Sequence, residues 1–263
     1  MRTPCFSGYF RTLAVAVALA FCVVRPAAAT DYTDIWWNSL ESGWGVNFIQ
    51  ADDFIFATFF IYGPALQPVW YTGQMSRDSN GVWSGPLYLT AGTYFGAPWN
   101  PAQRTAGQVG TVTFSPSSSH GGMLTYNVDN VVVTRQLTRQ TLKTIVLGGG
   151  YFGGVVADVY NCTNPLHNAT VRFFAEVVAT QTTGGVIQLD FTTGNDTCSI
   201  VGNYLQDGQL YRIPVAAYTC ANGLSTTAAV SELKATNFGL EGRWIAPVSG
   251  GCTEAGTFSF VLR

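Results

Sequence analysis

The stretch IQLDFT at residues 187–192 alternates apolar and polar side chains, and this pattern decides the fold class. The same alternation recurs in MLTYNV at 123–128, VRFFAEVV at 171–178 and FSFVL at 258–262. Successive side chains of a β-strand point to opposite faces, so each run presents one apolar face to a core. Helical periodicity is nearly absent, and the chain is therefore predicted to be all-β.

Short segments rich in Asn, Asp and Gly separate these runs. These residues tolerate the positive φ angles that tight hairpins require. Strands divided by such turns every 8 to 12 residues or so are typical of sandwiches and barrels. We therefore expect two small antiparallel β-barrel or sandwich domains, each a meander of about eight strands. The predicted turns lie at 51–53, 63–64, 79–81, 117–121, 129–130, 183–185, 194–196, 207–208 and 221–223.

The first 29 residues have the pattern of a cleavable signal peptide. Arg2 and Arg11 are basic, residues 13–24 form an uncharged apolar run, and Ala27-Ala28-Ala29 offers a small-residue cleavage site. The apolar run is shorter than the roughly 20 residues of a membrane-spanning helix. We predict export to the periplasm or outside the cell, with no integral membrane span after cleavage.

The net charge of the chain argues against a nucleic-acid partner. Residues 1–29 contain three of the 13 basic residues and none of the 15 acidic ones, so their removal lowers the net charge from −2 to −5. Nucleic-acid binding depends on Lys and Arg that neutralise phosphates, so no nucleic-acid partner is expected.

Four cysteines remain after the predicted cleavage, and all of them lie in the second half of the chain. An even number in an exported chain indicates two disulfides, for which three connectivities exist. In an eight-stranded up-and-down barrel the first and last strands are neighbours, which favours a Cys162–Cys252 bond. Cys198 and Cys220 flank a predicted hairpin and would form the second bond. The predicted domains are an aromatic-rich one at 30–143 and a disulfide-stapled one at 148–263.

Two segments of the first domain are unusual. The stretch FIFATFFIY at 54–62 is apolar on both faces, so we expect this strand to be covered on each side. The stretch TAGTYFGAPWNPAQRTAG at 90–107 reads as one long loop, and loops of that length in compact domains are usually functional or mobile.

The stretch IWWNSLESGWGVN at 35–47 holds three tryptophans, one glutamate and two glycines. It resembles the W-W-N-x-x-E-S-G-W-G segment of uncharacterised exported proteins from Gram-negative bacteria. The likeness covers residues 33–140 or so and includes Pro68 to Tyr71 and the loop around Trp99. It implies a bacterial, exported protein and assigns no catalytic residue.

The motif has two interpretations. In the structural one, the tryptophans plug one end of a barrel, Gly43 and Gly45 permit close backbone approach, and Glu41 bonds to backbone N–H groups or to an arginine. In the functional one, aromatic rings form a stacking platform and polar groups orient a glycan or a small apolar ligand. The candidate ligand-binding residues are Trp36, Trp37, Asn38, Glu41, Trp44, Trp70, Tyr94 and Trp99.

Patterns of known catalytic and metal sites are missing from the sequence. The cysteines lack C-x-x-C spacing, and neither H-x-H nor G-x-S-x-G occurs, so we expect no metal, no cofactor and no catalytic triad. The favoured function is a secreted, non-enzymatic binding or surface-interaction protein. The alternatives are a secreted hydrolase acting on carbohydrate through Glu41 or another acid, and an outer-membrane-associated barrel. Oligomeric state is left open.

Overall fold

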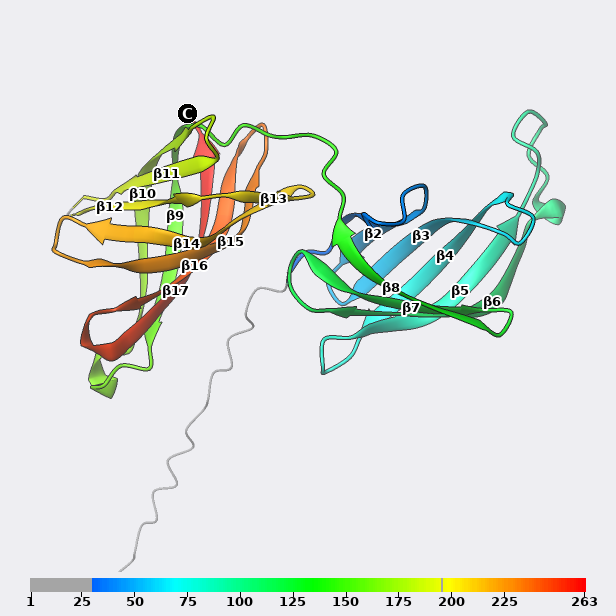
Figure 1. The fold of residues 1–263 in the computed structure, drawn as a ribbon, viewed down its shortest axis with the longest axis horizontal. Coiled ribbons are helices and arrows are strands. Elements are labelled where there is room, and N and C mark those ends of the chain that lie inside the picture. The colour runs from blue at the N-terminus through cyan, green and yellow to red at the C-terminus, as the bar shows by residue number, and fades with distance from the viewer. Residues whose placement is uncertain (1–29, 195) are drawn as a thin grey trace, which may run out of the picture.

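The computed structural model describes residues 30–194 and 196–263, which form two closed antiparallel β-barrels of eight strands each. The barrels lie beside each other and are joined by the extended segment 140–148 (Figure 1). The predicted signal peptide lies outside the described residues. The all-β prediction is confirmed, and both units are barrels rather than sandwiches.

The first barrel is a simple meander in which each strand pairs with the next and β8 closes the barrel on β1. Its long β5–β6 connection spans 92–104 and contains the short 3-10 helix η1 (Pro101–Gln103), so it is shorter than the expected loop. The strands are β1 (Asp34–Trp37), β2 (Gly45–Ala51), β3 (Phe54–Tyr62), β4 (Pro68–Arg77), β5 (Trp83–Ala91), β6 (Thr105–Pro116), β7 (Gly121–Val128) and β8 (Val131–Arg139).

The second barrel follows the same plan with one addition. Pairing of β12 with β14 closes it, and the short β13 extends the β14 hairpin beyond the barrel. The strands are β9 (Gly149–Tyr160), β10 (Ala169–Gln181), β11 (Val186–Thr192), β12 (Thr197–Asn203), β13 (Leu205–Asp207), β14 (Leu210–Cys220), β15 (Ser225–Ala235), β16 (Gly239–Val248) and β17 (Cys252–Leu262). Two further 3-10 turns, η2 (Pro165–His167) and η3 (Ser249–Gly251), lie in its connections.

The turn residues behave as their chemistry requires. Asp52, Asp129 and Asn130 have φ angles of 49°, 49° and 64°, and Gly208 has a φ of 65°. These left-handed conformations connect adjacent strands at three of the predicted turns, 51–53, 129–130 and 207–208.

Both barrel interiors are filled by side chains from alternate strand positions. Small eight-stranded barrels have just enough interior width for this. The core of the first barrel includes Trp36, Phe48, Phe59, Trp83 and Phe114, and that of the second includes Tyr151, Tyr211, Trp244, Phe258 and Phe260.

Strand β3 departs from expectation. Its inward residues Ile55, Ala57 and Phe59 are fully buried, but its outer face is not covered by the other barrel. Phe60 and Tyr62 are each 58% exposed. The prediction that this strand is covered on both sides is therefore wrong, because closure of the barrel pairs both edges of β3 and leaves its outer face in solvent.

The four cysteines form disulfides between Cys162 and Cys252 and between Cys198 and Cys220, the two pairs expected from the strand order. The first bond joins the β9–β10 connection to the start of β17. The second joins residues directly opposite each other on β12 and β14, at the pairing that closes the barrel. Both bonds fit an extracytoplasmic protein, since disulfides persist in oxidising compartments. Within the described part of the chain, no helix is long and apolar enough to cross a membrane.

Removing the two disulfides separately should destabilise the second barrel to different degrees. The bonds close loops with sequence separations of 90 and 22 residues. Loop-closure entropy predicts a loss of between about 4 and 5 kcal/mol for Cys162→Ser with Cys252→Ser, and about 3 kcal/mol for Cys198→Ser with Cys220→Ser. Urea unfolding of the two double variants measures this, and a larger loss from the shorter loop would contradict the entropic account.

Candidate functional site

The tryptophan-rich motif is divided between the interior of the first barrel and the β1–β2 connection. Trp36 points inward from β1 and is completely buried against Phe48 and Phe114. Its Nε1–H donates to the carbonyl of Tyr32 at 2.9 Å, and the guanidinium carbon of Arg139 lies 4.8 Å from its ring centroid. A ring enclosed in this way cannot stack on a ligand, so Trp36 has a structural role.

Glu41 and Trp44 lie together in the β1–β2 connection. Glu41 Oε2 accepts from Arg135 Nε at 2.7 Å and from Trp44 Nε1 at 3.2 Å. The motif glycines serve the same turn: Gly43 has a φ of 106°, and a Cβ on Gly45 would lie 3.0 Å from the Trp36 carbonyl oxygen. These contacts agree with the structural interpretation of the motif, in which an arginine neutralises Glu41.

The neighbours of this cluster complete the turn. Asn38 Oδ1 accepts from the Leu40 N–H at 2.9 Å, so its side chain stabilises the β1–β2 turn. Trp37, the next residue on β1 after Trp36, is half-buried. Burial raises the pKa of Tyr126, with the Glu41 carboxylate adding to the rise and Arg135 opposing it.

The other candidate aromatics do not converge with the motif. Trp70 is 50% exposed on the outer face of β4, opposite Phe60 of β3. Tyr94 and Trp99 are each 67% exposed on the 92–104 loop, where Tyr94 packs on Phe95 with ring centroids 4.6 Å apart. The eight predicted residues therefore occupy several separate places and do not form one pocket.

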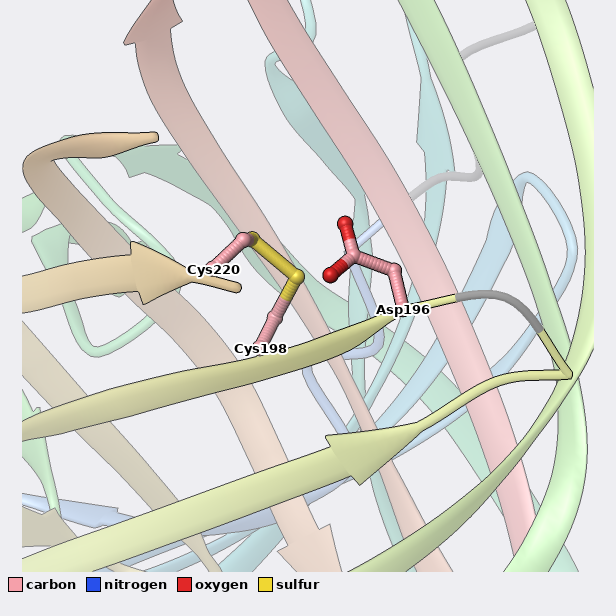
Figure 2. A group of neighbouring side chains, drawn as sticks. All are labelled: Asp196, Cys198 and Cys220. Carbon is pink, nitrogen blue, oxygen red and sulfur yellow. A yellow bond between two sulfur atoms is a disulfide. The ribbon is translucent and has the colours of Figure 1, made fainter. Parts of the chain in front are cut away.

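A group of potential metal ligands occurs in the second barrel but is not suited to a metal. Asp196 lies beside Cys198 and Cys220, and these two sulfurs are bonded to each other (Figure 2). Cysteine binds metals as the thiolate, so the disulfide removes two of the three donors. One carboxylate is insufficient for a transition-metal site.

The strongest candidate site is a groove of about 700 Å³ between the barrels. We call it the inter-barrel groove. Its floor is the outer face of β9, β16 and β17, where Gly154 leaves open space because a Cβ there would meet nothing within 4 Å. The remaining lining comes from the outer end of β10, from β15, from the β13–β14 turn, from the segment leading into β1 and from Arg139 at the end of β8. Side chains of the groove wall include Asp31, Arg172, Phe174, Glu232, Lys234, Glu241 and Arg243.

The groove combines charges of both signs with apolar surface. Arg243 Nε lies 3.1 Å from Glu232 Oε2, so these two residues form an ion pair. Arg172 and Lys234 make no ion pair with any residue in the described ranges, and Lys234 faces Glu241 across the β15–β16 ladder. Phe174 is 71% exposed. Such a mixture of apolar wall and unpaired polar groups is typical of ligand sites.

The groove exists because a small polar interface fixes one barrel against the other. Arg139 Nη1 lies 3.2 Å from Asp34 Oδ2, and the side chains of this ion pair are only 1% and 4% exposed. The same Asp34 oxygen accepts the N–H of Gln209, from the β13–β14 turn, at 3.1 Å. Thr30 Oγ1 also donates to Glu232 Oε1 at 2.6 Å. The segment 30–34 and the β13–β14 turn thus hold the barrels together.

His120 lies near this interface, on the β6–β7 turn. Its Nδ1 is buried and has no hydrogen-bond partner among the described residues. Burial lowers the pKa of His120, Arg212 and Arg139 lower it further, and Asp207 opposes them. The neutral imidazole is therefore favoured next to the two arginines.

Sequence reasoning missed the inter-barrel groove. Its residues come from positions between 31 and 259, and no pair of them forms a recognisable motif. The one available signal was the alternation in β10, which places Arg172 and Phe174 on the same outer face. That signal does not reveal which other strands share the surface.

Comparison with known proteins identifies no family for the chain. No family model matches it, and no curated protein matches its sequence. Among solved structures, it is similar to a protein of unknown function from the DUF3598 family of Nostoc punctiforme, with 11% identity, a TM-score of 0.25, and coverage of 87% of this chain and 93% of that one. It is also similar to isotype 1 transferrin binding protein B from serogroup B Neisseria meningitidis, with 10% identity, a TM-score of 0.31, and coverage of 88% and 69%.

Replacing Trp36 and Trp70 separately by alanine should show by the loss of stability which tryptophan belongs to the core and which to the surface. Trp36→Ala removes a fully buried ring and is expected to lower the free energy of unfolding by about 3 to 5 kcal/mol. Trp70→Ala removes a ring that is 50% exposed, so a loss below about 1 kcal/mol is expected. Urea denaturation monitored by circular dichroism measures the free energy of unfolding of the two variants. Equal losses of this free energy would refute the assignment of Trp36 to the core.

Proposed function

We propose that this protein is an exported, non-enzymatic binding protein of the periplasm or extracellular space, and that its ligand occupies the inter-barrel groove. The observation that carries the proposal is the groove itself, about 700 Å³ in volume and walled by charged and aromatic side chains. Ligand pockets typically measure roughly 300 to 1,000 Å³ and combine apolar walls with a few polar groups.

Binding outside the barrels also follows from how the interiors are used. Trp36, Phe59 and Phe114 are fully buried inside the first barrel, as are Leu189 and Ile213 inside the second. These side chains occupy the space that larger barrels leave for a ligand. The surface between the barrels is the alternative position for a site.

The charges of the groove favour a ligand that carries an anionic group next to an apolar part. Arg172 and Lys234 offer two cations that the described chain does not neutralise by an ion pair, and Phe174 offers an apolar wall. An acidic glycan, a fatty acid and an acidic peptide all combine these features. Glu41 has a different role in this proposal, since its ion pair with Arg135 stabilises the first barrel.

A ligand panel with matched glycine variants tests the proposal. Oligogalacturonate, oleate and an acidic heptapeptide are added separately while Tm is measured. At least one should raise Tm by a few degrees, because a ligand at 100 times its Kd stabilises the folded state by about 2.7 kcal/mol. Gly154→Leu should abolish the shift, because its side chain would enter the open floor of the groove.

Gly150→Leu is the matched control. Gly150 lies on the same strand, β9, and a Cβ there also meets nothing within 4 Å, but it does not line the groove. This variant should keep the ligand-induced shift. No shift with any of the three compounds, or an equal shift in Gly154→Leu, would refute the groove as the binding site.

A further inference from the structure

Among the residues that the structure describes, one stretch of β10 has a strand partner on only one side. Residues 169–175 pair with β9, from Ala169 opposite Val159 to Ala175 opposite Gly153. Pairing with β11 begins only at Glu176, which faces Thr192. Seven residues of a regular strand therefore present an edge that the ladder of the second barrel does not use, and we call them the free edge.

The free edge is unusually apolar for an exposed strand edge. Val171 is 41% exposed, Phe173 37% and Phe174 71%. Natural proteins usually protect such edges with lysine, proline, a bulge or a covering segment. The sequence ATVRFFA contains a single charge, Arg172, and its pairing with β9 is regular. An edge of this kind is a template for a further strand.

The free edge and the inter-barrel groove form one surface. Arg172, Phe173 and Phe174 are members of the free edge and also line the groove. The groove thus reaches the edge where a new strand would be added. A ligand that pairs with the edge would place its side chains beside the charged groove wall.

We infer that the ligand of the inter-barrel groove is an extended polypeptide segment that pairs with residues 169–175 and carries an acidic side chain opposite Arg172. This inference rests on the proposed function and adds the class of ligand. Main-chain hydrogen bonds to an exposed sheet edge supply affinity in this mode of recognition, and alternate side chains supply specificity.

The chemistry of the edge determines what the segment should contain. Residues directly opposite each other on paired antiparallel strands have Cβ atoms about 5 Å apart, so opposite charges there are stabilising. An acidic residue would face Arg172, whereas apolar residues at alternate positions would contact Val171 and Phe173 on the other face. A second copy of this chain is a poorer partner, because antiparallel pairing of two free edges about their centres places Arg172 opposite Arg172.

Hydrogen exchange with two designed peptides tests the inference. The probes are the acetylated, amidated heptapeptides Thr-Val-Glu-Val-Thr-Val-Glu and Thr-Val-Lys-Val-Thr-Val-Lys, added to the full protein. The acidic peptide should slow amide exchange within 169–175 at least tenfold, because added main-chain bonds protect the free amides. The basic peptide should bind at least tenfold more weakly, because its lysine faces Arg172.

Reversing the charge of Arg172 tests whether this residue sets the preference for the acidic peptide. Arg172→Glu should invert the preference, so that the basic peptide protects 169–175 and the acidic one does not. Arg172 is exposed, which makes the substitution tolerable for folding. Arg104→Glu introduces the same charge change on the exposed loop of the first barrel and should leave the preference for the acidic peptide unchanged.

Three outcomes would overturn the inference. These are an absence of protection at 169–175 with either peptide, an unchanged preference in Arg172→Glu, and protection that rises with protein concentration alone, which would indicate a second copy as the partner. If another compound still binds wild-type protein and loses binding in Gly154→Leu, the proposed function stands while the peptide inference fails. If no compound binds, both the proposed function and the peptide inference are refuted.

Discussion

The buried ion pair between Asp34 and Arg139 is the interaction on which the arrangement of this protein depends. Both side chains are almost completely removed from solvent, yet Asp34 still accepts a hydrogen bond from the backbone of Gln209. Removing one partner of such a pair typically costs 3 to 5 kcal/mol, because the other charge stays buried and unpaired. The turn at Gly208 packs directly on this pair. Contacts from one ion pair thus set the position of the second barrel against the first.

This constraint explains where a site can form. Each barrel buries large side chains at its inward positions and keeps its own interior for its core. Small barrels of this kind leave their outer faces, ends and strand edges for recognition. The inter-barrel groove uses one outer face, and the free edge of β10 extends it. The groove requires the barrels to keep a fixed relative position, since Asp31 and Arg139 line it from the side of the first barrel.

Much of the fold could be predicted because its signals are local. Alternating side chains mark the strands, and residues such as Asp129 and Asn130 adopt the positive φ angles expected of their turns. The covering of β3 was predicted wrongly, because composition does not reveal that barrel closure leaves an apolar outer face in solvent. The groove could not be predicted at all, because Arg172 of β10 and Lys234 of β15 come to line the same groove only through strand order and register. The division of the molecule into domains at 30–143 and 148–263 stays a prediction.

Residual dipolar couplings of backbone amides test most directly whether the barrels form one rigid unit. A common alignment tensor is predicted for both barrels of the wild-type protein. Gly208→Val should give two different tensors, because a Cβ at Gly208 would lie 2.2 Å from Asp34 Oδ2. Gly223→Val, at a hairpin turn of similar φ sign where a Cβ meets nothing within 4 Å, should keep the common tensor. Two tensors in the wild-type protein, or a common one in Gly208→Val, would contradict the account.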